Sequence, residues 1–248
     1  MYNVFSRMLH LVSLREKPSR RVCSPTPCSF TDTRLFLDLW LMPLHRMHLT
    51  TLEVTHSRTP EEIASLVSRL RPALPHLTNL TFSRRSRLVK PQVSYDLSAF
   101  ALSFLPAAGE RVVSPGPRQA NPTRIAKSKC LEDNSELDDT YTYHHLRRDV
   151  FSVVQETGVD IGSRYVVPSA HITLGRYLSQ GDHATDEMRE CWVQTIDDIN
   201  RWLENEVWEV ADGEFIGEWI VGQERGLDAR SGTLWYGGGR TISLGEGF

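Results

Sequence analysis

The chain is poor in cysteine, and its cysteines show none of the spacings typical of a thiol-based site. Cys23, Cys28, Cys130 and Cys191 form no C-x-x-C pair and have no histidine at a zinc-ligand spacing. Neither a zinc module nor a disulfide framework is therefore expected. A reducing compartment follows as the default, and we expect the cytoplasm.

The chain also lacks a long hydrophobic run. The longest run near the amino terminus, residues 35–42, contains Asp38, and its roughly eight residues fall far short of the ~20 that cross a bilayer. We interpret it as a first strand and expect no membrane association. Residues 1–34 carry more basic than acidic residues, and we expect a poorly ordered tail there, with a mitochondrial targeting segment as the alternative.

Two familiar catalytic signatures are missing as well. The chain has no G-x-S-x-G sequence, and the glycine run at 237–239 lacks the Lys-Ser/Thr pair of a phosphate-binding loop. These absences argue against a serine hydrolase of that type and a nucleotide triphosphatase. The net charge of -3 argues against an obligate duplex-binding surface. A chain of 248 residues with 40% hydrophobic residues fits one bilobed domain or two small ones.

Turn residues and apolar spacing predict alternating helices and strands. Thr59-Pro60-Glu61-Glu62 is a capping box that begins a helix over about residues 60–72. Two further helices are expected over about 143–157 and 185–205. Strands are expected near 35–42, 48, 87–95, 99–105, 164–167, 171, 207–210, 214–222 and 232–244. Residues 106–139 combine Pro-Gly sequences with an acidic run and predict a long loop insertion.

The order of these elements repeats, with helix and strands in one half followed by helix and strands in the other. This order predicts an α+β protein with two antiparallel sheets, flanked by helices, facing a central cleft.

A histidine, an apolar residue and a threonine follow one another at four places in the chain, starting at His48, His76, His171 and His183. Side chains two apart on a strand share a face, so each histidine would lie beside its threonine. Only the triplets at 48 and 171 continue as strands with apolar residues on the opposite face. One of them falls in each half of the repeated order, so we expect one motif in each lobe. The triplet at 76 follows a proline, and the one at 183 lies in turn sequence, where its threonine better fits a helix N-cap.

The two strand-like triplets contribute His48, Thr50, His171 and Thr173. Two imidazoles can exchange a proton near neutral pH, and two hydroxyls can donate hydrogen bonds to an oxyanion. This set suits acid-base cleavage of a phosphoester without a metal or another cofactor. Which histidine would be the base is left open.

The same motifs resemble those of the two-histidine (2H) phosphoesterase superfamily, most closely its fungal branch labelled RNA ligase/cyclic nucleotide phosphodiesterase. The phrases at 87–91, 143–149 and 164–171 strengthen the resemblance, which covers about residues 36–245. The resemblance implies a bilobal domain over 35–245, with 106–139 inserted between the motifs. It also implies that His48, His171, Thr50 and Thr173 hydrolyse 2′,3′-cyclic phosphates, on RNA ends or small nucleotides, to 2′-phosphates.

By the same resemblance, Arg176 and Tyr177 are candidates for contacting phosphate and stacking on the substrate, although a surface or lobe-bridging role for Arg176 stays open. A basic cluster of Arg84, Arg85, Arg87 and Lys90 would contact an RNA backbone or form a solvated loop and strand edge. A non-catalytic RNA-binding protein of the same fold is the alternative function. We expect a monomer.

Overall fold

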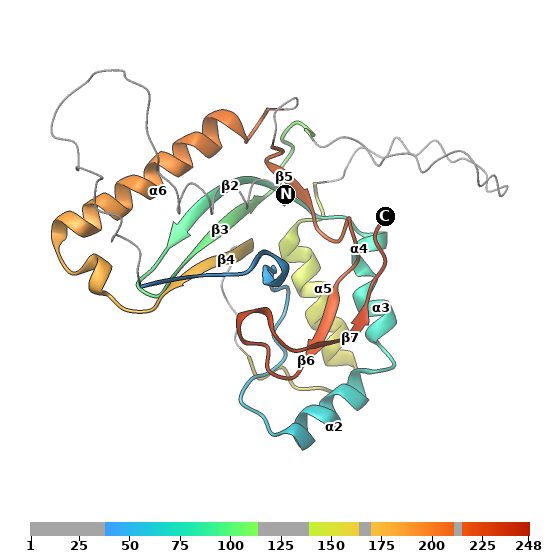
Figure 1. Ribbon diagram of the computed structural model, residues 1–248. Coiled ribbons are helices and arrows are strands. Elements are labelled where there is room, and N and C mark those ends of the chain that lie inside the picture. The colour runs from blue at the N-terminus through green and yellow to red at the C-terminus, as the bar shows by residue number, and fades with distance from the viewer. Residues whose placement is uncertain (1–37, 114–138, 164–169, 211–214) are drawn as a thin grey trace. The chain divides into compact units, whose positions relative to one another are not determined.

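The computed structural model describes residues 38–113, 139–163, 170–210 and 215–248. Its strands are β1 (Leu39–Leu41), β2 (Arg87–Tyr95), β3 (Ala99–Pro106), β4 (Ala170–Tyr177), β5 (Glu218–Ile220), β6 (Asp228–Ser231) and β7 (Arg240–Leu244). Its helices are α2 (Pro60–Leu70), α3 (Leu74–Thr78), α4 (Leu80–Ser83), α5 (Tyr143–Glu156) and α6 (Asp186–Glu206), with short 3-10 turns η1 (Leu44–Arg46), η2 (Gly181–His183) and η3 (Trp235–Gly237) (Figure 1).

A curled five-stranded antiparallel sheet has the strand order β1-β4-β3-β2-β5, and β6 and β7 form a small second sheet. The mixed α+β class predicted from the sequence is therefore confirmed. None of the described helices is both long and apolar enough to cross a membrane. The predicted tail at 1–34 and most of the predicted insertion at 106–139 lie outside the described residues.

The chain divides into two compact units. Among the described residues, the first comprises those within Met1–Leu49, Lys90–Phe104 and His171–Gly217, and the second those within Thr50–Val89, Leu105–Ala170 and Glu218–Phe248. The boundary at Leu49 falls inside the first His-x-Thr triplet.

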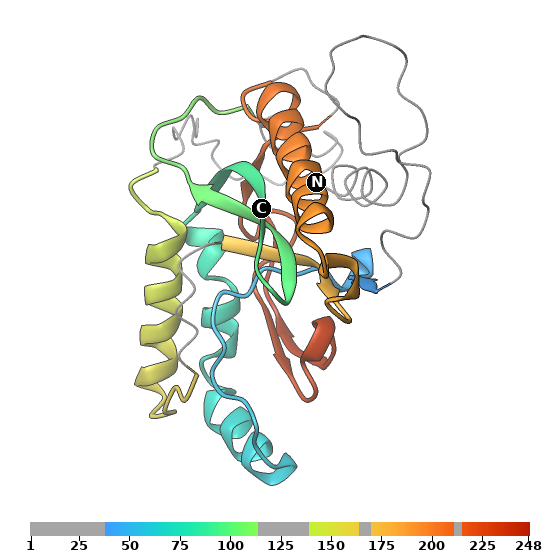
Figure 2. The ribbon, with the colours of Figure 1, turned by 90° about the vertical axis from the view of Figure 1, so that its left-hand side faces the viewer.

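In the first unit, α6 covers one face of the β2, β3 and β4 strands (Figure 2). Its buried stripe consists of Trp192, Ile196, Ile199 and Leu203, at the spacing expected of an amphipathic helix. The Asn200 side chain accepts a hydrogen bond from the Val93 N–H (2.6 Å) and donates one to the Val93 carbonyl (3.0 Å). An amide side chain thus pairs with the β2 backbone much as a neighbouring strand would, which fixes the helix along the sheet.

The glycine that follows the second His-x-Thr triplet has a packing reason. A Cβ atom at Gly175 would lie 2.5 Å from the Phe100 ring and 2.9 Å from the Trp40 carbonyl oxygen. Both distances are far below an ordinary contact, so any larger residue would displace β4 from its neighbours. The glycine at this position is therefore explained by the sheet's own packing.

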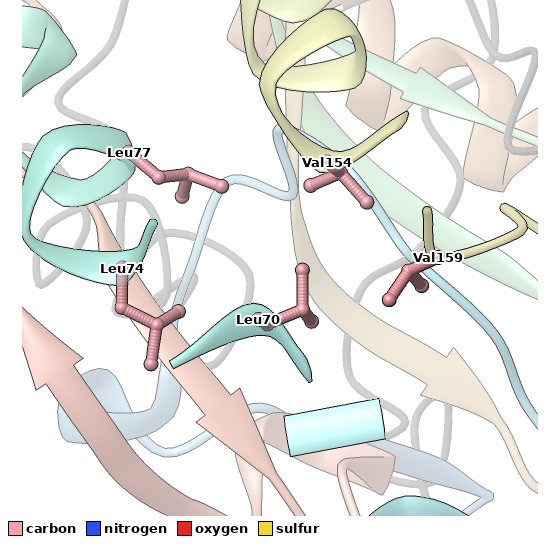
Figure 3. Close-up of a cluster of buried hydrophobic side chains, with 5 residues drawn as sticks. All are labelled: Leu70, Leu74, Leu77, Val154 and Val159. Atoms are coloured by element: carbon pink, nitrogen blue, oxygen red, sulfur yellow. The ribbon is translucent and has the colours of Figure 1, made fainter. Parts of the chain in front are cut away.

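The second unit has its own core, formed where α2, α3 and the end of α5 meet (Figure 3). Its buried side chains are Leu70, Leu74, Leu77, Val154 and Val159. The capping box predicted for the first helix is confirmed, because the Thr59 side chain accepts from the Glu62 N–H and Glu62 accepts from the Thr59 N–H. Helix α3 also packs against β6 and β7.

Three strand predictions need correction. Residues 207–210 form no strand, because Val207 and Trp208 both donate their N–H groups to the Leu203 carbonyl and so extend the hydrogen bonding of α6. The strand expected over 214–222 is only the short β5. The strand expected over 232–244 is limited to β7, since η3 interrupts the chain first. The strand predicted at 164–167 lies outside the described residues.

Candidate active site

The second His-x-Thr triplet lies in a regular strand. Along β4, Ala170, Ile172 and Leu174 are buried, whereas His171 and Thr173 are half-buried. This alternation is the one predicted from the sequence, with the apolar residues on one face and the histidine and threonine on the other. The strand therefore fixes the direction of the His171 and Thr173 side chains through the burial of their neighbours.

The strand predicted at 48 is also wrong. The first triplet follows the 3-10 turn η1, and only Leu49 pairs there, in an isolated bridge. The exposed His48 ring lies with Nδ1 2.8 Å from the Arg46 carbonyl oxygen. A carbonyl oxygen only accepts, so Nδ1 must carry the hydrogen and donate it. Neutral His48 is then left with Nε2 as its proton acceptor, which is the atom that a general base would use.

A backbone bridge joins the two triplets. Leu49 pairs with Ile172 in an isolated antiparallel β-bridge, and this register sets His48 beside Thr173. Both histidines belong to the first unit, whereas we expected one motif in each lobe. The reason is that β1 pairs with β4 and the chain returns at Leu49 to the same strand.

Thr50 is the first residue of the second unit, and there its backbone is held by α5. The Tyr143 hydroxyl donates to the Thr50 carbonyl (2.9 Å), and Arg147 Nε donates to the Thr51 carbonyl (3.1 Å). These two contacts were missed in the sequence, although a usable signal exists. Tyr143 and Arg147 are four residues apart on a predicted helix, so they share a face, and a buried tyrosine hydroxyl needs a partner.

Tyr177 and Arg176, the two residues predicted to contact substrate, both lie at the end of β4. Tyr177 packs against Phe100, Trp192 and His183, and its hydroxyl accepts from Trp192 Nε1 (2.9 Å). Burial raises the pKa of Tyr177 to about 12. Arg176 is half-buried at the end of β4. These surroundings account for Tyr177 without a substrate, and a substrate contact by either residue stays a prediction.

The predicted basic cluster is not a single surface. Arg87 is only 4% exposed and forms ion pairs with Asp139 and Glu218. Its guanidinium also donates to the carbonyls of Glu110 and Arg111. The interpretation of Arg87 as an RNA contact or a solvated side chain is therefore wrong, because a fully engaged buried cation has no donor left for a phosphate.

The other three members of the basic cluster are more accessible. Arg84 pairs with Asp149 (2.9 Å), Arg85 lies over the Phe248 ring, and Lys90 is 3.8 Å from Glu209. Arg84 is the exposed member of these three.

The other two triplets lie outside the strands, as predicted. The triplet at 76 lies in helix α3, and the one at 183 lies in η2, with Thr185 as the N-cap of α6. His145 Nδ1 accepts the Thr142 N–H at the start of α5. Among the described residues, no group of three or more His, Cys, Asp or Glu side chains is arranged to hold a metal ion.

Comparison with known proteins adds no relative to this picture. No family model matches the chain, and no curated protein or solved structure matches it either.

Proposed function

We propose that the protein is a metal-independent phosphoesterase that hydrolyses 2′,3′-cyclic phosphates, on RNA ends or small nucleotides, to 2′-phosphates. The observation that supports this most directly is the Leu49–Ile172 bridge, which brings the two His-x-Thr segments together although 123 residues separate their histidines. Under this proposal the chain is a 2H phosphoesterase with that superfamily's bilobal fold.

The proposed reaction needs one group to accept a proton and another to donate one. A neutral histidine removes a proton from water as its oxygen attacks phosphorus, and the protonated histidine gives its proton to the departing ribose 3′ oxygen. The P–O3′ bond breaks, and the phosphate stays on O2′. Each transfer is worth about 10² to 10⁴ in rate, and the Thr50 and Thr173 hydroxyls would donate to the non-bridging oxygens as their charge grows.

The hydrogen bond at His48 supports this chemistry without assigning its direction. With Nδ1 donating to the Arg46 carbonyl, the ring is oriented and Nε2 is the atom left to exchange protons. Either histidine could begin as the base. Opposite starting protonation states predict a bell-shaped pH dependence of kcat/KM.

The experiment that tests the function is a turnover panel with the purified full chain. We expect hydrolysis of 2′,3′-cyclic nucleotides or of RNA with a cyclic phosphate end, with 2′-phosphate as the product and no loss of activity in EDTA. A 3′-phosphate product would contradict the direction of cleavage. Activity that disappears on chelation and returns with a divalent ion would indicate a metal hydrolase.

The same panel decides the alternative function. An unchanged cyclic substrate, together with measurable binding of single-stranded RNA, would favour a non-catalytic RNA-binding protein. Arg84→Ala would then weaken RNA binding, because Arg84 is the exposed member of the basic cluster. Arg87 is unsuited as a probe of that contact, since its ion pairs are buried.

A further inference from the structure

Helix α5 donates hydrogen bonds to the chain at the last residue of the first His-x-Thr triplet and at the residue that follows it. The carbonyls of two consecutive residues, Thr50 and Thr51, both accept hydrogen bonds from this one helix. The donors, Tyr143 and Arg147, are one helical turn apart and come from the same face. The chain bends at Thr51, so the bend itself is where the helix holds it.

The helix is a firm support for these contacts. Tyr143 is 1% exposed, and Leu146, Val150 and Val154 continue the buried stripe along α5. The first turn is closed by the Thr142–His145 hydrogen bond and by the Leu146 N–H donating to the Thr142 carbonyl. Tyr143 is therefore the first residue of a helix whose position is fixed by its own burial.

We propose that Tyr143 and Arg147 are positioning residues that aim the Thr50 hydroxyl in the proposed phosphoesterase. This inference rests on the proposed function, since it assigns a purpose to the orientation of Thr50. The mechanism is geometric. The two held carbonyls belong to the peptide planes on either side of the Thr51 Cα. The first of these planes also sets the ψ angle of Thr50, and the rotamer open to the Thr50 side chain depends on its backbone angles.

Tyr143 does not touch the reacting atoms in this scheme. Its loss would let the Thr50 backbone turn, and the hydroxyl would no longer meet the oxygen whose charge grows in the transition state. Because such misplacement acts on the transition state more than on bound substrate, it should lower kcat and leave KM nearly unchanged.

The test compares two tyrosines that each lose only a hydroxyl. Tyr143→Phe removes the donor to Thr50, whereas Tyr141→Phe removes a half-buried hydroxyl that donates to Asp149 (3.0 Å) beside the same helix. We expect Tyr143→Phe to lower kcat about tenfold, and Tyr141→Phe to leave it unchanged. Arg147→Lys, which removes the Nε donor, is the second variant and should lower kcat in the same way. Equal kcat for Tyr143→Phe and the wild type would overturn the inference.

A double-mutant comparison separates aiming from general destabilisation. If Tyr143 acts through Thr50, then Tyr143→Phe should have no further effect on kcat in a Thr50→Val background. A general weakening of the fold would instead lower kcat by the same factor in both backgrounds, and that result would contradict the inference.

A measurement made without substrate tests this inference independently of the proposed function. The NMR couplings of Thr50 should report one side-chain rotamer in the wild type and in Tyr141→Phe, but an average in Tyr143→Phe. If the wild type hydrolyses nothing while these couplings behave as expected, the proposed function fails and the positioning contact stands. An unchanged Thr50 rotamer in Tyr143→Phe would overturn the positioning role, whatever the activity.

Discussion

The two His-x-Thr segments have nearly the same sequence pattern but are held in different ways. His171 lies in an eight-residue strand of the five-stranded sheet, between two buried neighbours on that strand. His48 is exposed, follows a 3-10 turn, and is oriented by a hydrogen bond to a carbonyl only two residues away. The His171 side chain is therefore oriented by the packing of its strand, and the His48 ring by a local hydrogen bond.

Two copies of one sequence motif can therefore be held in place by different kinds of contact. A side chain fixed by a sheet loses its place when the core is disturbed, whereas one fixed by its own turn depends little on distant packing. We therefore expect the two histidines to contribute equally to catalysis. We expect their segments to respond differently to core mutations and to pH.

The largest expected effect tests their equality in chemistry. His48→Ala and His171→Ala should each lower kcat/KM by at least about 10², because each removes one of the two proton transfers. His76→Ala, in the triplet that lies in helix α3, is the matched control and should be silent. Turnover of a 2′,3′-cyclic nucleotide is the measurement, and three equally active variants would refute the assignment.

A smaller effect tests whether the two segments depend equally on apolar packing. The two residues of the backbone bridge, Ile172 and Leu49, provide the comparison. Ile172 is 3% exposed, whereas its partner Leu49 is half-buried. We expect Ile172→Ala to lower the free energy of unfolding by about 2–5 kcal/mol. Leu49→Ala should cost about 1 kcal/mol, because it removes less buried surface. Denaturant unfolding measures both, and a larger loss for Leu49→Ala would reverse the comparison.

A still smaller effect is a pH dependence of stability. We expect it at strand β4, which carries His171, and not at the turn that carries His48. The Ser98 N–H and then the Ser98 hydroxyl lower the pKa of Asp96, in the turn between β2 and β3. The Ser98 carbonyl in turn accepts the Tyr177 N–H at the end of β4. The Arg46 carbonyl that orients His48 has no proton to gain.

The sign of this dependence follows from the lowered pKa. The stability that Asp96 contributes is complete above its unfolded pKa of about 3.9 and is lost as the pH falls through its lower folded value. The difference in melting temperature between the wild type and Asp96→Asn should therefore be present at neutral pH and shrink below pH ~4. A difference that stays constant through this range would show that the Asp96 charge is not involved.

Local signals in the sequence predicted the three longer helices, α2, α5 and α6, whereas the short helices α3 and α4 were missed. The capping box at Thr59, the N-cap at Thr185 and the amphipathic stripes of α2, α5 and α6 are set by residues within a few positions of one another. The alternation along β4 was equally readable, because one face of the strand is buried. The α+β class followed from the order of these elements.

The pairing of the two motifs was not readable in the same way. The Leu49–Ile172 bridge and the hydrogen bond from Tyr143 to Thr50 join residues about a hundred positions apart, and no local pattern encodes such a register. The prediction for Arg87 in the basic cluster was wrong for a related reason. Arg87 looks like its neighbours in sequence, and only the distant Asp139 and Glu218 turn it into a buried ion pair.

The Arg87 ion pairs also bear on how this chain could change in length. The Gly109 N–H donates to Asp139, and the Val113 N–H donates to Glu218, so the one guanidinium ties together residues on both sides of the 114–138 segment. Closing a loop between fixed ends costs entropy that grows only with the logarithm of its length, about 0.6 kcal/mol for each doubling. Evolution or an engineer could therefore lengthen the chain between residues 113 and 139 considerably while Val113 and Asp139 keep their places.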